Sequence, residues 1–301
     1  MCTLTLAWRA FPTAPVVVAA NRDESVDRPA ASPSRRPLWA ARPDEPAPLS
    51  GADDDPLNPS VDETPGRRAV GGAEGATDEN GSPQPRPRTA IAPRDERVGG
   101  TWIGANDRGV FAGVTNRWVG DLDGDRSRGL LVADCLRAPT AEAAARHVER
   151  AVEADAYAGF NLVVADAAAA LLLEWDGSLR VTRFDPGVHV VVNVGADGAF
   201  VQPPNRPPEV GPEQADDARR VRATLAPEPG EAVEGWLSRA KATLGDHGYG
   251  VCVHGDGFGT RSSSALILGD RRRYEFADGP PCEAPFEPVA EGWPAADDDR
   301  V

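Results

Sequence analysis

Two stretches near the start of the chain decide its fold: MCTLTLA at residues 1–7 and PVVVAANRDE at residues 15–24. The second contains a continuous apolar run, which is typical of a β-strand that is covered on both faces. The first places Cys2 at the beginning of another strand, directly behind the only methionine of the chain. The sequence therefore predicts strands at 2–7 and 15–20.

The rest of the chain continues in blocks of strands and helices. A hairpin is predicted from 99–104 and 110–116, because a turn signal at 106–109 joins two apolar runs. The remaining elements are predicted helices at 128–137, 140–154, 212–225 and 231–244, and predicted strands at 160–165, 170–175, 188–194, 249–254 and 263–268. This order predicts an α+β fold with two antiparallel sheets stacked face to face and helices outside. Because no GxGxxG or P-loop pattern is present, a nucleotide-binding α/β fold is disfavoured.

Two segments stand apart from this pattern. Residues 52–97 are rich in Gly, Pro and Asp and contain few large apolar side chains, so we interpret them as a disordered insertion. Residues 279–301 form an acidic, Pro-rich tail that we expect to be frayed. The sequence thus predicts a single domain over residues 1–278, interrupted by the insertion.

The composition limits the partners of the protein. Among 301 residues, 47 acidic ones face 32 basic ones, which gives a net charge of −15, and Lys241 is the only lysine. A chain that is this acidic, and whose basic residues are almost all arginine, is typical of a GC-rich genome and a halophilic host. The charge argues against nucleic acid and anionic membranes as partners.

The cysteine pattern and the hydropathy bear on compartment and cofactors. The four cysteines have no CxxC spacing, so neither a zinc site nor a disulfide framework is indicated. No apolar run reaches the length of a membrane span, and the start lacks the basic region of a secretory signal. We expect a cytoplasmic protein, where a reducing environment keeps Cys2 as a thiol.

Cys2 has a chemistry of its own because of its position. Removal of Met1 would leave Cys2 with a free α-amine, whose pKa is about 7.7–8.0 in model peptides. That amine can take the proton of the thiol on the same residue, which makes the residue a self-contained nucleophile. The alternative is that Cys2 is a small apolar residue at the start of a strand.

Seven motifs follow one another along the chain. They are MCT at 1–3, AANRDE at 19–24, GGTWIG at 99–104, TN at 115–116, RG at 128–129, GFNL at 159–162 and GFGTRS at 257–262. In this order they resemble the NRDE family, which is also called the transport and Golgi organisation protein 2 family. The resemblance covers the chain apart from the insertion and the tail. It implies a four-layer αββα sandwich like that of N-terminal nucleophile (Ntn) hydrolases.

The resemblance also implies roles for individual residues. In Ntn hydrolases of this kind a cysteine like Cys2 attacks a C–N bond, and Asp23 matches the aspartate that fixes the α-amine. Asn116 and Asn193 match the oxyanion-site asparagines, and Arg261 matches a late arginine that stabilises the nucleophile. Those hydrolases carry an arginine where this chain has Ala20. This chain has Arg22 inside the motif instead, and the sequence leaves open whether Arg22 reaches the thiol.

Each of these residues also has a structural interpretation. Strand-end turns account for both asparagines equally well, and an ion pair with a carboxylate accounts for Arg261. Asn21, Arg22 and Glu24 are candidate supporting residues, and a local ion pair also explains Arg22 and Glu24.

The histidines bear on a haem or metal ligand. The resemblance implies a haem-trafficking role, so His189 and His254 are candidate haem or metal ligands as well as ordinary structural residues. His147 and His247 are expected to be solvated. The sequence shows no CxxCH motif or axial pair, so no resident cofactor or metal site is predicted.

Two functions therefore remain open. The first is a cysteine hydrolase of the N-terminal nucleophile type that acts on a small amide or acyl thioester. The second is a non-enzymatic carrier that holds haem or a fatty-acyl ligand in the same cleft. The chain retains Cys2, Asp23, Asn116, Asn193 and Arg261, which favours the hydrolase. The displaced arginine and the trafficking association favour the carrier.

Overall fold

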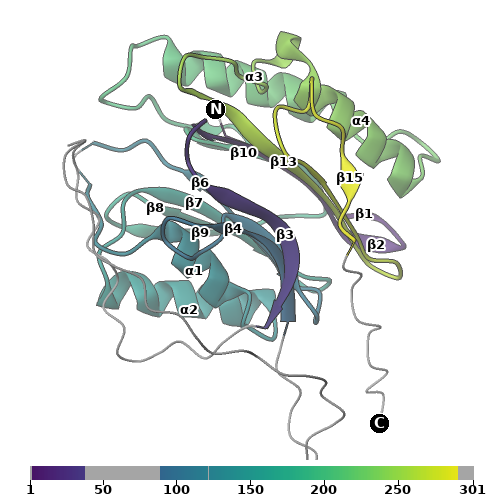
Figure 1. Ribbon diagram of the computed structural model, residues 1–301, viewed down its shortest axis with the longest axis horizontal. Coiled ribbons are helices and arrows are strands. Elements are labelled where there is room, and N and C mark those ends of the chain that lie inside the picture. The colour runs from purple at the N-terminus through teal and green to yellow at the C-terminus, as the bar shows by residue number, and fades with distance from the viewer. Residues whose placement is uncertain (1, 38–88, 121, 291–301) are drawn as a thin grey trace, which may run out of the picture.

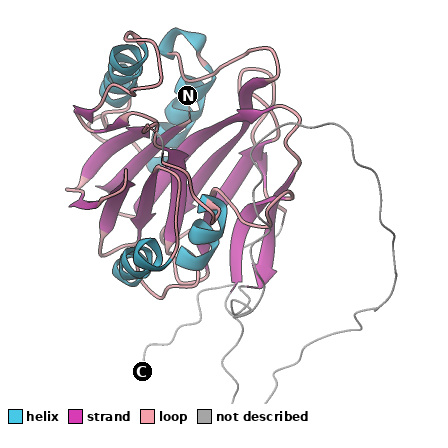
Figure 2. Cartoon of the chain, turned by 90° about the vertical axis from the view of Figure 1, so that its left-hand side faces the viewer, coloured by secondary structure: helices cyan, strands magenta, loops and turns pink. Residues whose placement is uncertain are grey.

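The structure, a computed structural model, describes residues 2–37, 89–120 and 122–290. Its described strands form two sheets in which every pairing is antiparallel. One sheet has the order β12-β11-β10-β1-β2-β13-β14-β15, and the other has the order β3-β4-β5-β6-β7-β8-β9. The two sheets stack face to face, and helices cover their outer faces (Figure 1). In Figure 2 the strands occupy the middle of the molecule, with helices above and below them.

The first sheet consists of β1 (Thr3–Phe11), β2 (Ala14–Ser25), β10 (Gly187–Val192), β11 (Gly195–Ala196), β12 (Ala199–Phe200), β13 (Phe258–Leu268), β14 (Arg273–Ala277) and β15 (Glu287–Pro288). The second sheet consists of β3 (Ala30–Pro37), β4 (Thr89–Asp95), β5 (Ile103–Asn106), β6 (Phe111–Asn116), β7 (Phe160–Ala165), β8 (Ala170–Trp175) and β9 (Leu179–Arg183). The helices are α1 (Arg128–Cys135), α2 (Ala141–Ala154), α3 (Val210–Thr224) and α4 (Val233–Gly245), and η1 (His247–Tyr249) is a short 3-10 helix.

Three hydrophobic cores separate the four layers. One lies between the sheets, one lies between the first sheet and α3 and α4, and one lies between the second sheet and α1 and α2. Strand β2 shows how the sequence produces this arrangement: Val16 and Val18 point into the core between the sheets, while Val17 and Ala19 pack against the outer helices. The predicted α+β sandwich and the strand covered on both faces are confirmed.

The register of three neighbouring strands sets the position of the site. β2 pairs with β1 on one side and with β13 on the other, so that Thr3 lies opposite Asn21 and Thr260 lies opposite Asp23. The β2–β13 register shifts between Thr260 and Ser262, which leaves Arg261 as the extra residue of a bulge. The start of β1, the end of β2 and the start of β13 therefore meet at one end of the first sheet.

The predicted helices and most of the predicted strands are confirmed. Strands β7 and β8 have the predicted limits, and α2 begins after Thr140, whose side chain accepts a hydrogen bond from the backbone N–H of Ala143. None of the helices in the described part of the chain combines the length and hydrophobicity that crossing a membrane requires.

The limits of the predicted insertion need correction. Residues 89–95, which were assigned to it, form β4 and pair with β3 and β5. Ala90 and Ala92 of β4 face the core beneath α1, and Ile91 faces the core between the sheets. Small alanine side chains suffice here because the helix packs close to the sheet, so the scarcity of large apolar residues was misleading. Residues 38–88 lie outside the described residues.

The predicted tail needs a similar correction. Residues 279–290 are part of the ordered molecule: β15 pairs with β14, Phe286 packs against the core beneath α4, and Val289 packs against the core between the sheets. Residues 291–301 lie outside the described residues.

The strand predicted at 249–254 is also wrong. The chain forms η1 there and continues as coil, with Gly250 in the left-handed region at φ 69°. Side chains take up most of the bonds that a neighbouring strand would make: Asn21 donates to the Val251 carbonyl oxygen, and Thr260 Oγ1 accepts from the Val253 N–H. One backbone bond to β13 is present, from the Thr260 N–H to the Val253 carbonyl oxygen.

Candidate active site

A cavity of about 110 Å³ opens where β1 begins and β2 ends. The second sheet contributes residues from the end of β6 and from the segment before β5, and the start of α1 closes the cavity from a third side. Its polar lining residues are Cys2, Thr3, Asn21, Arg22, Asp23, Glu24, Arg28, Asp95, Thr101, Thr115, Asn116, Ser127, Arg128 and Ser264, and Trp102 is its largest apolar one. Six of the eight candidate site residues of the sequence therefore meet in one cavity, whereas Asn193 and Arg261 do not line it.

The Cys2 thiol is held at the end of β2. Its Sγ lies 3.3 Å from both the backbone nitrogen and the carbonyl oxygen of Asp23. Burial, together with the negative charge of Asp23, raises the pKa of this thiol to about 11. With a residue still attached before Cys2, the thiol is therefore protonated at neutral pH and is a weak nucleophile.

Asp23 is buried beside this thiol. Its carboxylate accepts a hydrogen bond from Thr260 Oγ1 at 2.7 Å, and its side chain is 4% exposed. Burial raises the pKa of the Asp23 carboxyl, and the Thr260 hydrogen bond opposes that shift. An anionic group in this position suits a role in orienting an amine on Cys2.

Asn21 has a structural task at the same edge. Its Nδ2 donates to the carbonyl oxygens of Leu244 and Val251, at 2.9 and 2.8 Å, and its Oδ1 accepts from Ser263 Oγ at 2.6 Å. These bonds tie the end of α4 to the sheet and use the side chain fully. Asn21 therefore has a structural role at the cavity.

Arg22 reaches the cavity. Its guanidinium lies over the Trp102 ring, 4.0 Å from the ring centroid, and it forms an ion pair with Glu24 at 3.6 Å. Nη1 of Arg22 is buried and has no hydrogen-bond partner among the described residues. Burial lowers the pKa of the Arg22 guanidinium, and the nearby Cys2 and Glu24 oppose that shift. The predicted Arg22–Glu24 pair is present, and it leaves one donor available to a ligand.

Glu24 and Arg28 form the polar rim. Arg28 donates to Asp95 at 2.7 Å and lies 3.6 Å from Glu24, so its charge is balanced by two carboxylates. This network joins β2 to β4 across the two sheets.

Arg128 is a site residue that sequence reasoning left out, although the RG motif contains it. Its Nη1 donates to the Gly159 carbonyl oxygen at 2.7 Å, and burial lowers the pKa of its guanidinium. The negative charge of a Cys2 thiolate would oppose that shift. Two arginines, Arg22 and Arg128, thus line the same cavity as Cys2.

Two glycines explain why Arg128 lies there. A Cβ on Gly100 would stand 2.3 Å from the backbone carbon of Gly129, and Thr101 N donates to the Gly129 carbonyl oxygen at 3.0 Å. The GGTW and RG motifs are therefore one contact between two backbones. Because this contact seats the first turn of α1 against the loop before β5, it carries both Trp102 and Arg128 into the cavity.

The two candidate oxyanion asparagines occupy different positions. Asn116 ends β6 and lines the cavity, and within the described residues no hydrogen bond engages its side-chain amide. Asn193 lies behind it, 2% exposed, and its Nδ2 donates to the Asn116 carbonyl oxygen at 2.8 Å. In this arrangement Asn193 supports Asn116.

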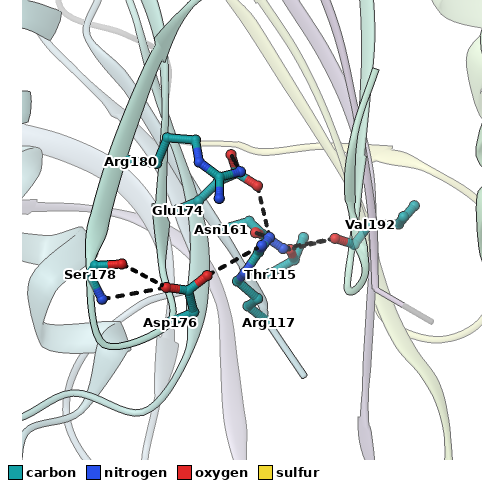
Figure 3. Close-up of polar contacts among 8 residues, drawn as sticks. All are labelled: Thr115, Arg117, Asn161, Glu174, Asp176, Ser178, Arg180 and Val192. Carbon is teal, nitrogen blue, oxygen red and sulfur yellow. Dashed lines mark hydrogen bonds and ion pairs between the residues drawn. The ribbon is translucent and has the colours of Figure 1, made fainter. Parts of the chain in front are cut away.

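A buried polar network includes Thr115 and Arg117, the two chain neighbours of Asn116 (Figure 3). Arg117 Nη1 donates to Glu174 at 2.8 Å and to Asn161 Oδ1 at 3.0 Å. Asn161 Nδ2 in turn donates to the Val192 carbonyl oxygen at 2.8 Å, and Thr115 Oγ1 donates to the same oxygen at 3.4 Å. The network bonds β6 and β7 of one sheet to β10 of the other, so it fixes the distance between the two walls of the site.

Arg261 points elsewhere. Its side chain is 27% exposed and forms an ion pair with Asp278 at 3.0 Å. The bulge that contains Arg261 explains this direction, because an extra residue in a strand breaks the alternation of faces. The role that the resemblance gives to Arg261 stays a prediction.

The candidate histidine ligands differ in availability. His189 is buried, stacks on Phe184 with ring centroids 4.0 Å apart, and uses Nδ1 on Asp197 and Nε2 on the Asp185 carbonyl oxygen. Both ring nitrogens are engaged, so His189 offers none to a metal or haem. His254 is exposed and lies among two cysteines and another histidine.

The comparisons with known proteins fit these observations. Residues 81–205 match the family model described as "Transport and Golgi organisation 2". This part of the chain is similar to the transport and Golgi organisation 2 family. The matched residues include the Gly100–Gly129 contact, Asn116, Arg128 and Asn161, so the family segment supplies the second wall of the cavity. The resemblance inferred from the sequence is confirmed. A comparison with curated proteins found no match.

Several solved structures resemble the chain at low identity. Penicillin V acylase from Agrobacterium tumefaciens has 15% identity and a TM-score of 0.48, over 92% of this chain and 83% of that one. A mutant of conjugated bile acid hydrolase from Clostridium perfringens has 11% identity and a TM-score of 0.45, over 92% and 89%. A Caenorhabditis elegans ortholog of N-acylethanolamine-hydrolyzing acid amidase has 10% identity and a TM-score of 0.46, over 88% and 92%.

Proposed function

We propose that the chain is a cysteine hydrolase of the N-terminal nucleophile type, which cleaves a small amide or acyl thioester once the residue before Cys2 has been removed. One observation carries the proposal: the Cys2 thiol faces a cavity whose other polar residues include the buried carboxylate of Asp23 and the guanidinium groups of Arg22 and Arg128. An acid, two cations and a thiol in one enclosed place are the components of nucleophilic catalysis.

The reaction would run in two stages. Sγ of Cys2 attacks the carbonyl carbon of the substrate, a C–S bond forms, and the freed α-amine of Cys2 takes the thiol proton. The tetrahedral intermediate then breaks its C–N bond, or its C–S bond to the leaving thiol, and the leaving group takes the proton from the amine. Water hydrolyses the resulting thioester, which releases the acid and restores the thiol.

The free amine is needed because burial raises the pKa of Cys2 to about 11, so the thiol is protonated at neutral pH. A free α-amine has a pKa of about 7.7–8.0 in model peptides, so a large fraction of it is neutral at about pH 7.5 and can accept the thiol proton as a general base while the sulfur attacks. Asp23 would hold this amine, and Thr260 would hold Asp23 through the 2.7 Å hydrogen bond. Arg22 and Arg128 would stabilise the thiolate, which is the role that the resemblance gives to Arg261.

Asn116 would serve the oxyanion. Its side-chain amide lines the cavity and is not engaged by the described residues, while Asn193 supports its backbone from behind. Loss of one oxyanion donor typically lowers kcat by about 10²–10³. We therefore assign Asn116 to the oxyanion and Asn193 to its positioning.

The cavity favours a small acyl group. Its volume of about 110 Å³ is below the roughly 300–1,000 Å³ of pockets that enclose drug-sized ligands. The buried Nη1 of Arg22 offers a donor to a carbonyl or carboxylate oxygen of the substrate. A cytoplasmic location suits the proposal, because a reducing compartment keeps the thiol free.

The proposal is tested with two forms of the chain. One carries a leader that a protease removes directly before Cys2, and the other keeps the leader. We expect the processed form to hydrolyse members of a panel of short N-acyl amides and acyl thioesters, and the leader-bearing form and processed Cys2→Ala to be inactive. Cys135→Ala is the matched control, because Cys135 is fully buried in the core beneath α1. Equal rates in the processed parent and in Cys2→Ala would refute the proposal.

A second function is favoured by one observation. The thiol stays protonated while a residue precedes Cys2, and the unpaired donor on Arg22 could still hold an anionic ligand. In that state the same cavity would hold the anionic end of an acyl or haem ligand, and the rest of the ligand would lie outside its volume of about 110 Å³. Titration of the leader-bearing form with an acyl-coenzyme A and with haem tests this, and an absence of saturable binding at micromolar protein would exclude it.

A further inference from the structure

Four side chains of soft or borderline donors converge at the end of α4. His247 belongs to η1, Cys252 and His254 follow it in the coil that leads to β13, and Cys282 lies in the turn after β14. One ligand atom from each residue lies within 4.8 Å of those of the other three. Cys252 is buried, and the other three residues are exposed, so the cluster is open to an ion from solvent.

The distances within the cluster match a tetrahedral zinc site. Zn–S and Zn–N bonds of about 2.3 and 2.0 Å in a tetrahedron place two sulfurs about 3.8 Å apart and a sulfur and a nitrogen about 3.5 Å apart. Here Sγ of Cys252 lies 3.5 Å from Sγ of Cys282, and Nε2 of His254 lies 3.8 Å and 3.1 Å from these two sulfurs. The rings of His247 and His254 are 5.1 Å apart and inclined by 70°, so they approach from different directions.

The chemistry of the four ligand atoms favours zinc. Two thiolates and two imidazoles are a common tetrahedral zinc set, whereas Mg²⁺ and Ca²⁺ prefer oxygen ligands. The other ring nitrogen of His254 faces Glu283 at 3.9 Å, which resembles the carboxylate that often orients a zinc-binding histidine. We propose that His247, Cys252, His254 and Cys282 together bind one zinc ion.

The zinc ion would stabilise the wall of the cavity from a position outside the cavity. It would join the segment 247–254 to the turn at 280–284, which already packs against the end of α4 near Gly245. Val253, between two of the ligands, exchanges two hydrogen bonds with Thr260, and Thr260 holds the Asp23 carboxylate. The zinc site would therefore be structural. It does not depend on the hydrolase proposal, because its ligands are not those of the cavity.

The test uses the full chain, reduced and stripped of metal. Titration with Zn²⁺ against a chromophoric chelator should show one saturable site per chain. Co²⁺ in place of Zn²⁺ should give the charge-transfer absorption of two thiolates. Cys282→Ser should lose at least tenfold in Zn²⁺ affinity and about half of that absorption, and His254→Ala should lose affinity with the absorption kept. Cys135→Ala is the matched control and should bind as the parent does, because Cys135 lies in a different core.

Three results would overturn the proposal. The first is that the reduced chain takes up no Zn²⁺ in a saturable way. The second is that Cys282→Ser binds Zn²⁺ with the affinity of the parent. The third is a Cys252–Cys282 disulfide that persists in reductant and excludes the metal. Cys282 is exposed, so its serine variant should fold. Its metal-free thermal unfolding, compared with that of the metal-free parent, separates a loss of ligand from a loss of fold.

Discussion

Thr260 donates a 2.7 Å hydrogen bond to the carboxylate of Asp23, although 237 residues separate them in the chain. The bond joins the last long strand of the first sheet to the NRDE motif of β2. The bond also favours the ionised form of Asp23, because it opposes the rise that burial causes in the pKa of this carboxyl. The support of the proposed catalytic residue is thus spread over both ends of the sequence.

Thr260→Val should therefore shift the pH dependence of hydrolysis. Without the hydroxyl the pKa of Asp23 rises further, so Asp23 is protonated at higher pH and the acid limb of the kcat/KM profile should move upward. The variant should also lose about 1–3 kcal/mol of stability, because the Val253 N–H loses its acceptor. Thr182→Val, the same change on exposed β9, should change neither quantity. An unshifted acid limb in Thr260→Val would contradict the role of Asp23.

The contact between Gly100 and Gly129 predicts a severe effect of one methyl group. Gly100→Ala would place its Cβ 2.3 Å from the backbone of Gly129, so the loop and the first turn of α1 must separate. Overpacking of this kind costs about 1–3 kcal/mol or more. Gly235→Ala is the control, because a Cβ on this exposed helical glycine meets only side-chain atoms beyond 3.6 Å. It should stabilise the protein by about 0.5–1 kcal/mol. Chemical denaturation of both variants measures the difference.

The buried network of Arg117, Asn161 and Glu174 predicts that two substitutions affecting Glu174 differ in their cost in stability. Glu174→Gln would remove the 2.8 Å carboxylate partner of the buried Arg117 guanidinium and leave it only the more distant Asp176 at 3.6 Å, so the cost should approach the roughly 3–5 kcal/mol of a broken buried pair. Arg180→Ala removes an exposed partner of the same carboxylate, and its effect should stay below about 1 kcal/mol. Equal destabilisation by the two changes would contradict the importance of the buried pair.

The position of Arg128 predicts that Arg128 contributes more to hydrolysis than Arg261 does. Arg128→Met should lower kcat/KM by about tenfold or more, because Arg128 lines the same cavity as Cys2 and its positive charge favours a Cys2 thiolate. Arg261→Met should have a much smaller effect, because Arg261 pairs with Asp278 outside the cavity. The reverse order would restore the role that the family resemblance gives to Arg261.

Periodicity predicted the sheets and helices because burial follows it closely. The run at 16–20 alternates between two cores, and the predicted limits of β7 and β8 are those of the structure. The pattern failed where alanines replace larger side chains, as in β4, and where side chains take the place of a strand partner for part of the backbone, as at Val251 and Val253.

The candidate site could be predicted only in part. The motifs supplied Cys2, Asp23, Arg22 and Asn116, which line one cavity. The direction of Arg261 depends on a bulge that spacing does not reveal, and Arg128 depends on a contact between two distant glycines. The proposed zinc ligands were missed because Cys282 joins the others only through the turn after β14, although His247, Cys252 and His254 lie within eight residues.

The most direct measurement of the central claim is the alkylation rate of Cys2 as a function of pH, followed by peptide-resolved mass spectrometry with and without a preceding leader. The account predicts that the leader-bearing chain reacts at Cys2 only as pH approaches about 11, the pKa of its buried thiol. The processed chain should react readily near neutral pH, because the free amine accepts the thiol proton as the sulfur attacks. Identical profiles for the two forms would contradict the claim that Cys2 is an N-terminal nucleophile.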